Sequence, residues 1–277
     1  MNRNATDRGL LSAPARRQAR RGPANGQSTA RTLIGGAVGV GALVLAWASM
    51  SAGQPEIILP SPTQTWRALQ TLALSGALLD SLGLTLYRAA TGVLLGLGIG
   101  VVWGALCGVS GWVSSVSRPL ISALMAVPPV VLVSLGLIWL GPGPGVSRLV
   151  IVLVALPLII ITVEEAVRDL DRNLIEMAQV FRLPRLSRLL HVVAPGVASP
   201  VLAATTVTFG QSLRVAIMAE LLSAVTGVGA QIQQAQTNLD TARIFAWTIT
   251  VVVVVILLEA AVLKPLQARL LRWRSLP

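Results

Sequence analysis

The chain has 277 residues, of which 54% are hydrophobic and only 12% charged, and its mean hydropathy is +0.74. A soluble domain carries about a quarter charged residues, so this composition excludes an ordinary soluble protein and indicates a polytopic membrane protein. The single cysteine, Cys107, excludes a disulfide framework and a CxxC metal site. The net charge of +11 would suggest a nucleic-acid partner in a soluble protein, but in a membrane protein the distribution of the charge along the chain matters more than its sum.

The first 31 residues differ from the rest of the chain. They are rich in Arg, Pro, Gly, Ser and Asn and contain no sustained apolar run, so we interpret residues 1–31 as a disordered, basic cytoplasmic tail. They do not resemble a cleavable signal peptide, because the next apolar segment continues into a full span without an A-x-A-type cleavage site. Residues 32–277 are expected to form one transmembrane domain.

Six apolar segments are long enough to cross a bilayer, which takes about 20 helical residues. They are Leu33–Met50, Leu82–Val109, Pro119–Leu140, Arg148–Val167, Val197–Ala224 and Ile244–Leu263. With the N-terminus in the cytoplasm, seventeen of the 22 Lys and Arg residues lie on the cytoplasmic side, and three on the other side: Arg67, Arg148 and Arg243. The six segments predict an all-α, six-span protein, and the charge bias predicts that both termini lie in the cytoplasm.

Three segments are expected on the extracytoplasmic side. Residues 51–81 predict a short helix along the interface, with Trp66 as its anchor. The sequence GPGPG at 141–145 predicts a tight turn, and residues 225–243 predict a polar loop that dips back toward the helices.

The second span carries glycine at every fourth position. A face without side chains lets another helix approach closely, so dispersion contacts replace the missing hydrophobic drive. We expect helix packing at Gly92, Gly96, Gly100, Gly104 and Gly108, and the repeat indicates nothing about the solute.

Polar side chains inside the spans mark candidates for the translocation path, because charge within hydrocarbon is costly. The candidates are Arg88, Gln211, Arg214 and Glu220. Arg214 could attract an anionic solute, or it could pair with a carboxylate or lie at a dimer seam. Arg214 and Glu220 lie on roughly opposite faces of one helix, so each needs a partner from another helix. For Arg88, snorkelling to the interface is the preferred expectation.

Three further acidic residues lie near the inner ends of spans. Glu164 and Glu165 are expected to pair with the basic loop that follows the fourth span, and Glu259 is assigned no role.

A basic segment, EMAQVFRLPRLSRLLHVVAPG at 176–196, interrupts the apolar chain on the cytoplasmic side. Residues 172–181 can form one short helix, Pro184 begins a second, and Pro195 ends it. The second helix is apolar on one face and carries Arg185, Arg188 and His191 on another. It could dock into a groove of a soluble partner, or it could be an ordinary basic loop retained by its charge.

The spacing of this segment resembles the EAA loop of ABC-importer permeases, whose pattern is E-A-A, three residues, G, nine residues, I-x-L-P. The matching positions are Glu176, Met177, Ala178, Val192, Ala194 and Pro195. The glycine of the pattern falls on Arg182, and Pro184 could supply the break between the helices instead. The resemblance implies a two-helix coupling loop at about residues 169–195.

Four further segments are similar, in order and spacing, to permeases of the nitrate/sulfonate/taurine branch. They are LPSP at 59–62, SLGLTLYRAATG at 81–92, AVPPVVLVSLGLIWLGPG at 126–143 and AELLSAVTGVG at 219–229. The resemblance implies a type I ABC-importer permease in the bacterial inner membrane, acting as a homodimer. It also implies two separate ATPase subunits, an extracytoplasmic solute-binding protein, and a small, anionic solute.

The sequence lacks the G-x-x-x-x-G-K-[ST] loop that holds nucleotide phosphates. We therefore expect no bound cofactor and ATP hydrolysis in the partner subunit. A vitamin precursor or bicarbonate as the solute stays open, and so does an ATP-independent channel or scaffold. A membrane-embedded enzyme is poorly supported, because one His, one Cys and no HExxH motif give it little chemistry.

Overall fold

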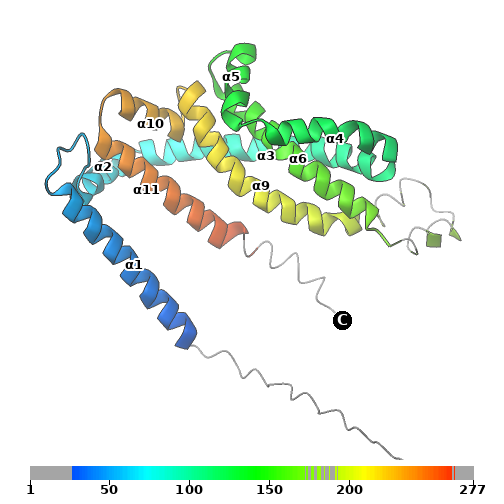
Figure 1. The fold of residues 1–277 in the computed structure, drawn as a ribbon, viewed down its shortest axis with the longest axis horizontal. Helices are drawn as coiled ribbons and strands as arrows, with labels where there is room; N and C mark the ends of the chain where they lie inside the picture. Colours follow the sequence, from blue (N-terminus) through cyan, green and yellow to red (C-terminus); the bar gives the residue numbers. More distant parts are fainter. Residues whose placement is uncertain are drawn as a thin grey trace, which may run out of the picture. The chain divides into compact units, whose positions relative to one another are not determined.

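The computed structural model describes residues 27–171, 173, 176, 177, 180, 181, 184, 187, 191, 193–263 and 265. Within these residues every regular element is a helix (Figure 1). The chain divides into a unit of residues 1–47 and a unit of residues 48–277. The first helix, α1 (Gln27–Ser51), contains the first predicted span. It begins before residue 31, so the last five residues assigned to the disordered tail are helical.

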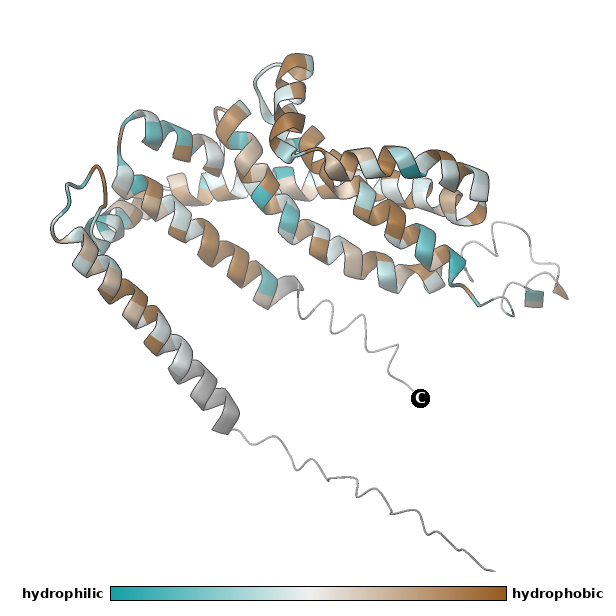
Figure 2. Cartoon of the chain, in the orientation of Figure 1, coloured by the Kyte–Doolittle hydropathy of each residue, from teal (hydrophilic) through white to brown (hydrophobic). Residues whose placement is uncertain are grey.

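Eight α-helices follow in the described part of the second unit. They are α2 (Pro62–Leu74), α3 (Ala77–Val109), α4 (Gly111–Ala126), α5 (Pro129–Leu140), α6 (Pro144–Arg168), α9 (Ala194–Ser223), α10 (Val228–Thr237) and α11 (Thr241–Leu258), which continues into the π-helical η2 (Glu259–Leu263). By length and hydropathy, α3, α6, α9 and α11 can each cross a membrane. They coincide with the second, fourth, fifth and sixth predicted spans (Figure 2).

The third predicted span, Pro119–Leu140, is wrong as a single straight helix. α4 ends at Ala126, α5 begins at Pro129, and the two axes are bent by 99°. Pro128 has no N–H to continue the helical ladder, and a residue that precedes a proline avoids the helical region. Val127 accordingly has φ −77° and ψ 122°, which is extended backbone.

The glycine face of α3 packs directly against α6. A Cβ atom at Gly92 would lie 2.6 Å from Ile151, and one at Gly104 would lie 2.7 Å from the backbone oxygen of Ile160. Gly96, Gly100 and Gly108 face α6 in the same way. The backbones of α3 and α6 therefore approach to a distance that side chains would prevent.

Three connections shape the second unit around α9. α2 begins with a capping box of Ser61 and Gln64, and Trp66 is exposed on its surface. A glycine turn joins α5 to α6, where the Gly143 N–H donates to the Ser223 carbonyl of α9 at 2.8 Å. The predicted polar loop at 225–243 contains α10, whose buried residues pack against the fully buried Trp247 of α11.

Candidate functional site

A buried ion pair joins α3 to α9. Arg88 Nη1 donates to Glu220 Oε1 at 2.6 Å, and the two side chains are 4% and 0% exposed. The snorkelling predicted for Arg88 is wrong, because Glu220 gives the guanidinium a partner inside the protein. The prediction that the partner of Glu220 comes from another helix is confirmed.

The same pair holds the chain between α9 and α10. Arg88 donates to both the carbonyl and the hydroxyl of Thr226, each at 2.6 Å. Glu220 Oε2 accepts from the Thr85 hydroxyl at 2.7 Å and from the Gly229 N–H at 3.2 Å. Gly227 has φ 103°, and a Cβ atom there would lie 2.5 Å from Glu220 Oε2. Only glycine fits both the backbone angle and the space against this carboxylate.

Sequence reasoning missed the hydroxyl partners in this network. Thr85 lies one turn before Arg88 on α3, and the spacing of three residues is the signal that could have placed both on one face. Thr226 precedes the positive-φ Gly227, and nothing in the local sequence indicates that its carbonyl returns to α3.

A second ion pair has the opposite exposure. Arg214 Nη2 of α9 lies 3.5 Å from Glu259 Oε1 at the start of η2, and the two side chains are 65% and 43% exposed. Gln211, one turn before Arg214, is also exposed. Both helices are candidate membrane spans. Of the alternatives for Arg214, the structure supplies the carboxylate partner, which is the residue assigned no role, yet it leaves the guanidinium accessible.

A third group of charges lies where α4 and α6 meet. Glu164 Oε1 accepts from the Ser114 hydroxyl at 2.7 Å and pairs with Arg168 Nη2 at 2.7 Å. Arg168 is the first residue of the predicted basic loop, so the pairing expected for Glu164 is found at the end of its own helix. A pocket of about 250 Å³ adjoins the pair of Glu164 and Arg168, and it is also lined by Arg118 and Glu165.

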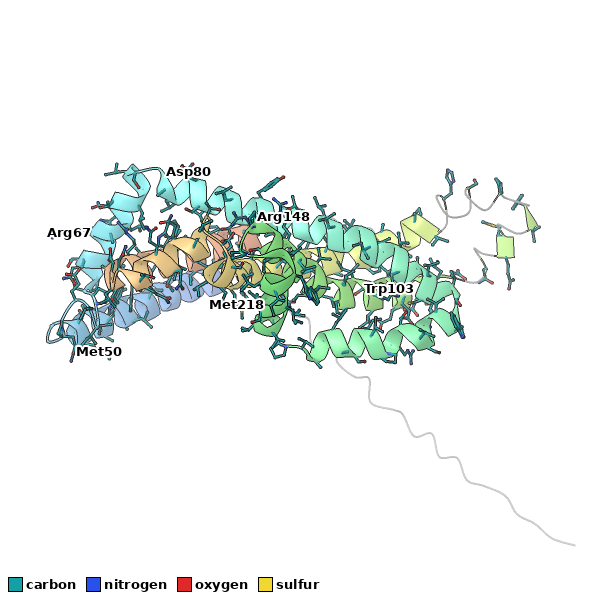
Figure 3. The ribbon with its side chains drawn as sticks, turned by 90° about the horizontal axis from the view of Figure 1, so that it is seen from above. Met50, Arg67, Asp80, Trp103, Arg148 and Met218 are labelled. Atoms are coloured by element: carbon teal, nitrogen blue, oxygen red, sulfur yellow. The ribbon has the colours of Figure 1, made fainter. Side chains whose placement is uncertain are left out.

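Trp103, near the C-terminal end of α3, connects α3 to α4. Its side chain lies toward α4 (Figure 3), where the indole N–H donates to Ser117 Oγ at 2.8 Å. The first turn of α4 is capped by Ser110, whose hydroxyl accepts from the Val113 N–H. These contacts give α3 and α4 a defined, side-by-side arrangement at this end.

The segment that resembles the EAA loop is only partly described. Glu176, Met177 and Val180 are helical, the Phe181 N–H donates to the Met177 carbonyl at 3.0 Å, and Pro184 has no regular structure. Met177, Val180 and Phe181 are exposed. Pro195 occupies the first turn of α9 rather than the gap before it. The other predicted coupling residues, Ala178, Arg182, Arg185, Arg188 and Val192, lie outside the described residues.

The sequence was compared with models of known protein families. Residues 96–272 match the family described as binding-protein-dependent transport system inner membrane component. The chain belongs to this family. It is the permease component of an ABC importer and not an enzyme, and the ATPase is a separate subunit.

Individual relatives agree with the family. The chain is 30% identical to the putative aliphatic sulfonates transport permease protein SsuC of Bacillus subtilis (strain 168), over 79% of each chain. It is 32% identical to the riboflavin transport system permease protein RibX of Chloroflexus aurantiacus, over 81% of this chain and 83% of that one.

A solved structure shows the same fold. A chain of the MetNI methionine ABC transporter, in an inward-facing conformation, aligns with 72% of this chain and 97% of its own length at a TM-score of 0.54 and 17% identity. The fold of a type I ABC-importer permease, predicted from the EAA-like spacing and the ordered motifs, is therefore confirmed.

Proposed function

We propose that this permease carries a small anionic solute of the sulfonate, taurine or nitrate kind, and that α9 lines its path. The observation that carries the proposal is the accessible guanidinium of Arg214 on a membrane-spanning helix, with the polar Gln211 one turn away. A cation in hydrocarbon is costly unless it meets water or an opposite charge. The aliphatic sulfonates in the name of the Bacillus relative support the same class of solute.

Arg88 and Glu220 have a different role in this proposal. They were candidates for the path, but both side chains are buried, and they bond to each other, to the buried Thr85 and to the exposed Thr226. A solute would have to break the pair in order to reach either residue. We assign Arg88 and Glu220 to closing the segment before α10 onto the bundle, and we leave Arg214 and Gln211 in the path.

We further propose that the chain crosses the membrane six times, with both termini in the cytoplasm. α1, the bent pair α4–α5 and the four long apolar helices supply the crossings. The excess of Lys and Arg in the tail, in the segment after α6 and at the C-terminal end supports the orientation. In this orientation the network of Arg88 and Glu220 lies at the outer end of α9.

The cytoplasmic segment at about residues 169–195 is proposed to couple transport to ATP hydrolysis. Its described part exposes Met177, Val180 and Phe181, large apolar side chains that lie outside the candidate spans. A cluster of this kind marks a surface that a partner covers. The EAA-like spacing indicates that the partner is the ATPase, into which the short helix docks.

The working transporter is proposed to contain two copies of this chain, two ATPase subunits and a binding protein. ATP binding closes the ATPases, their movement shifts the coupling segments, and the spans rock around a path between the two copies. The exposed face of α9 is the surface that this path requires.

A vitamin-like solute is the second candidate, favoured by the 32% identity to the riboflavin permease. The binding protein separates the two, because it selects the solute before the permease meets it. The experiment is a ligand screen of the binding protein that co-purifies with this chain, followed by uptake of the hits in liposomes that hold the complete importer. We expect sulfonates or other small anions to bind and to be transported. Binding and uptake of a neutral flavin, with none of the anions, would contradict the anionic solute.

A further inference from the structure

The side of α9 that carries Arg214 is an exposed stripe. Val207, Gln211, Arg214 and Leu222 are exposed and follow one another at spacings of three, four or eight residues, which places them on one helix face. Figure 2 shows hydrophilic residues among apolar ones along α9 and near the end of α11. Glu259 brings a second charge to this stripe from another helix.

The pair of Arg214 and Glu259 is not built like a structural ion pair. Its atoms are 3.5 Å apart, at the outer limit of a hydrogen bond, and both side chains are accessible. The Arg88–Glu220 pair, by contrast, has a 2.6 Å contact, and further donors satisfy the carboxylate. A long contact between accessible charges is weak and readily exchanged.

The position of Glu259 adds to this contrast. It is the first residue of the π-helical η2, and its carboxylate makes no other ion pair with the described residues. A π-helical turn is uncommon and often occurs at a functional site, and η2 lies at the end of the candidate span Thr241–Ala261. Here it follows directly on the last α-helical turn of α11 and carries the carboxylate that meets α9.

We propose that Glu259 is an exchangeable counter-ion for Arg214. In the empty path the carboxylate neutralises the guanidinium, and the anionic group of the solute replaces the carboxylate on Arg214 as it passes. When the solute leaves, Glu259 returns to Arg214, so the solute does not remain on a bare cation. The inference rests on the proposed function, because it requires that α9 lines a path for an anion.

The exchange makes Glu259 a specificity-determining residue through repulsion. A neutral solute cannot replace the carboxylate on Arg214, and a cation would be held by Glu259 and repelled by Arg214. Selectivity of the path for anions then comes from a pair of charges and not from Arg214 alone.

The test places a thiol beside the pair in the assembled importer. Gln211→Cys is made in the full chain and labelled in membrane vesicles with an anionic and a cationic thiol reagent. The natural Cys107 is fully buried, so the unsubstituted chain supplies the background. Leu94→Cys is the matched control, because Leu94 is also exposed on a spanning helix but belongs to none of the ion pairs formed among the described residues.

We expect the thiol introduced at position 211 to react and the thiol at position 94 to stay unreactive, because a thiol that faces lipid does not ionise. Adding Arg214→Gln should slow the anionic reagent at position 211 about fivefold, and adding Glu259→Gln should accelerate it by a similar factor, which is the effect of a unit charge about 4 Å away in water. The cationic reagent should shift in the opposite direction. An anionic solute delivered by the binding protein should protect position 211 only when Arg214 is present.

The outcomes separate the two levels of the proposal. Equal labelling of Gln211→Cys and Leu94→Cys, or none of Gln211→Cys, would overturn the path along α9 and with it the exchange. Labelling of Gln211→Cys at rates that neither Arg214→Gln nor Glu259→Gln changes would overturn the exchange alone. The Arg214→Gln/Glu259→Gln double variant guards against misfolding, since it leaves no unpaired charge, and it should return both reagents to nearly equal rates.

Discussion

Arg88 and Arg214 both pair with a glutamate of another element, but their environments differ in burial. Arg88 and Glu220 are buried, and hydroxyl and backbone groups bond to both side chains. Removing one charge therefore leaves the other without an opposite charge and shielded from water. Arg214 and Glu259 are accessible, so either charge can lose its partner and find another. Burial therefore separates a charge that holds the structure from a charge that can meet a solute.

Glu220→Gln tests the structural role of the buried pair. The substitution keeps the shape of the side chain but leaves Arg88 unpaired, which costs about 3–5 kcal/mol for a buried charge. We expect a large loss of thermal stability in detergent, measured as the midpoint of unfolding. Glu165→Gln removes an exposed carboxylate and should change little. Equal stability of the two variants would show that Glu220 does not anchor this end of α9.

Arg214→Gln tests the role of the accessible guanidinium. Loss of one charge-assisted contact of about 1.5–3 kcal/mol should lower uptake of an anionic solute at least tenfold, at normal protein level. Arg214→Lys keeps the charge and should retain part of the uptake. Unchanged uptake by Arg214→Gln would return Arg214 to a position at a seam or on the lipid surface.

Individual polar residues were predicted less well than the helices that carry them. The sequence identified Arg88, Glu220 and Arg214 as unusual, because a charged residue inside an apolar run can be recognised without knowing the tertiary structure. Their partners were not visible, since Arg88 and Glu220 are 132 residues apart and meet only through tertiary packing. Glu259 was assigned no role, because it lies near the end of a span, where a charged residue is common.

At the scale of elements, the glycines of α3 show a pattern that needs no tertiary information. A repeat of four residues lies along one helix face, and the structure puts that face against α6. The sequence could not name the partner helix, because any apolar helix can approach a face of glycines.

Gly104→Ala tests this packing. The new Cβ atom would lie 2.7 Å from the backbone oxygen of Ile160, so α3 and α6 must move apart, at a cost of about 1–3 kcal/mol. We expect a lower unfolding midpoint in detergent. Gly98→Ala is the matched control on the same helix, since no described residue outside the surrounding turns of α3 lies within 4 Å of its Cβ position. It should be neutral or slightly stabilising, because alanine favours a helix by about 1 kcal/mol over glycine. Similar losses for both variants would contradict close packing at Gly104.

The break between α4 and α5 marks the limit of predicting spans from hydropathy. Residues 119–140 are apolar enough for one crossing, and only the pair Pro128–Pro129 signalled an interruption. Hydropathy measures whether a segment prefers lipid, whereas the backbone angle at Val127 decides whether it continues as a helix. The prolines should have outweighed the hydropathy in that stretch.

Glu176→Lys tests the coupling segment. The proposed groove of the ATPase would meet a reversed charge, and we expect several-fold less ATPase in co-purification, with the permease dimer intact in cross-linking. Glu56→Lys reverses an exposed charge between α1 and α2 and should leave the association unchanged. Normal co-purification by Glu176→Lys would count against docking at this segment.

For the whole molecule, the sequence predicted the class of protein and the order of its helices. Composition, the lengths of the apolar runs and the ordered motifs are summed over many residues, so they tolerate local errors. The family match over residues 96–272 and the shared fold agree with that prediction. The identity of the solute could not be predicted in this way, because the residues that select it are few and the binding protein makes the first selection.

As the permease of an ABC importer, this chain is expected to move its solute only when a separate ATPase drives it. Liposomes holding the permease are loaded with ATP, with and without the ATPase subunit, and uptake of solute bound to the binding protein is measured together with ATP hydrolysis. We predict uptake only with the ATPase present, and hydrolysis that rises when the loaded binding protein is added. Uptake that continues undiminished without the ATPase would show that the chain is not an ATP-driven permease and would indicate a channel.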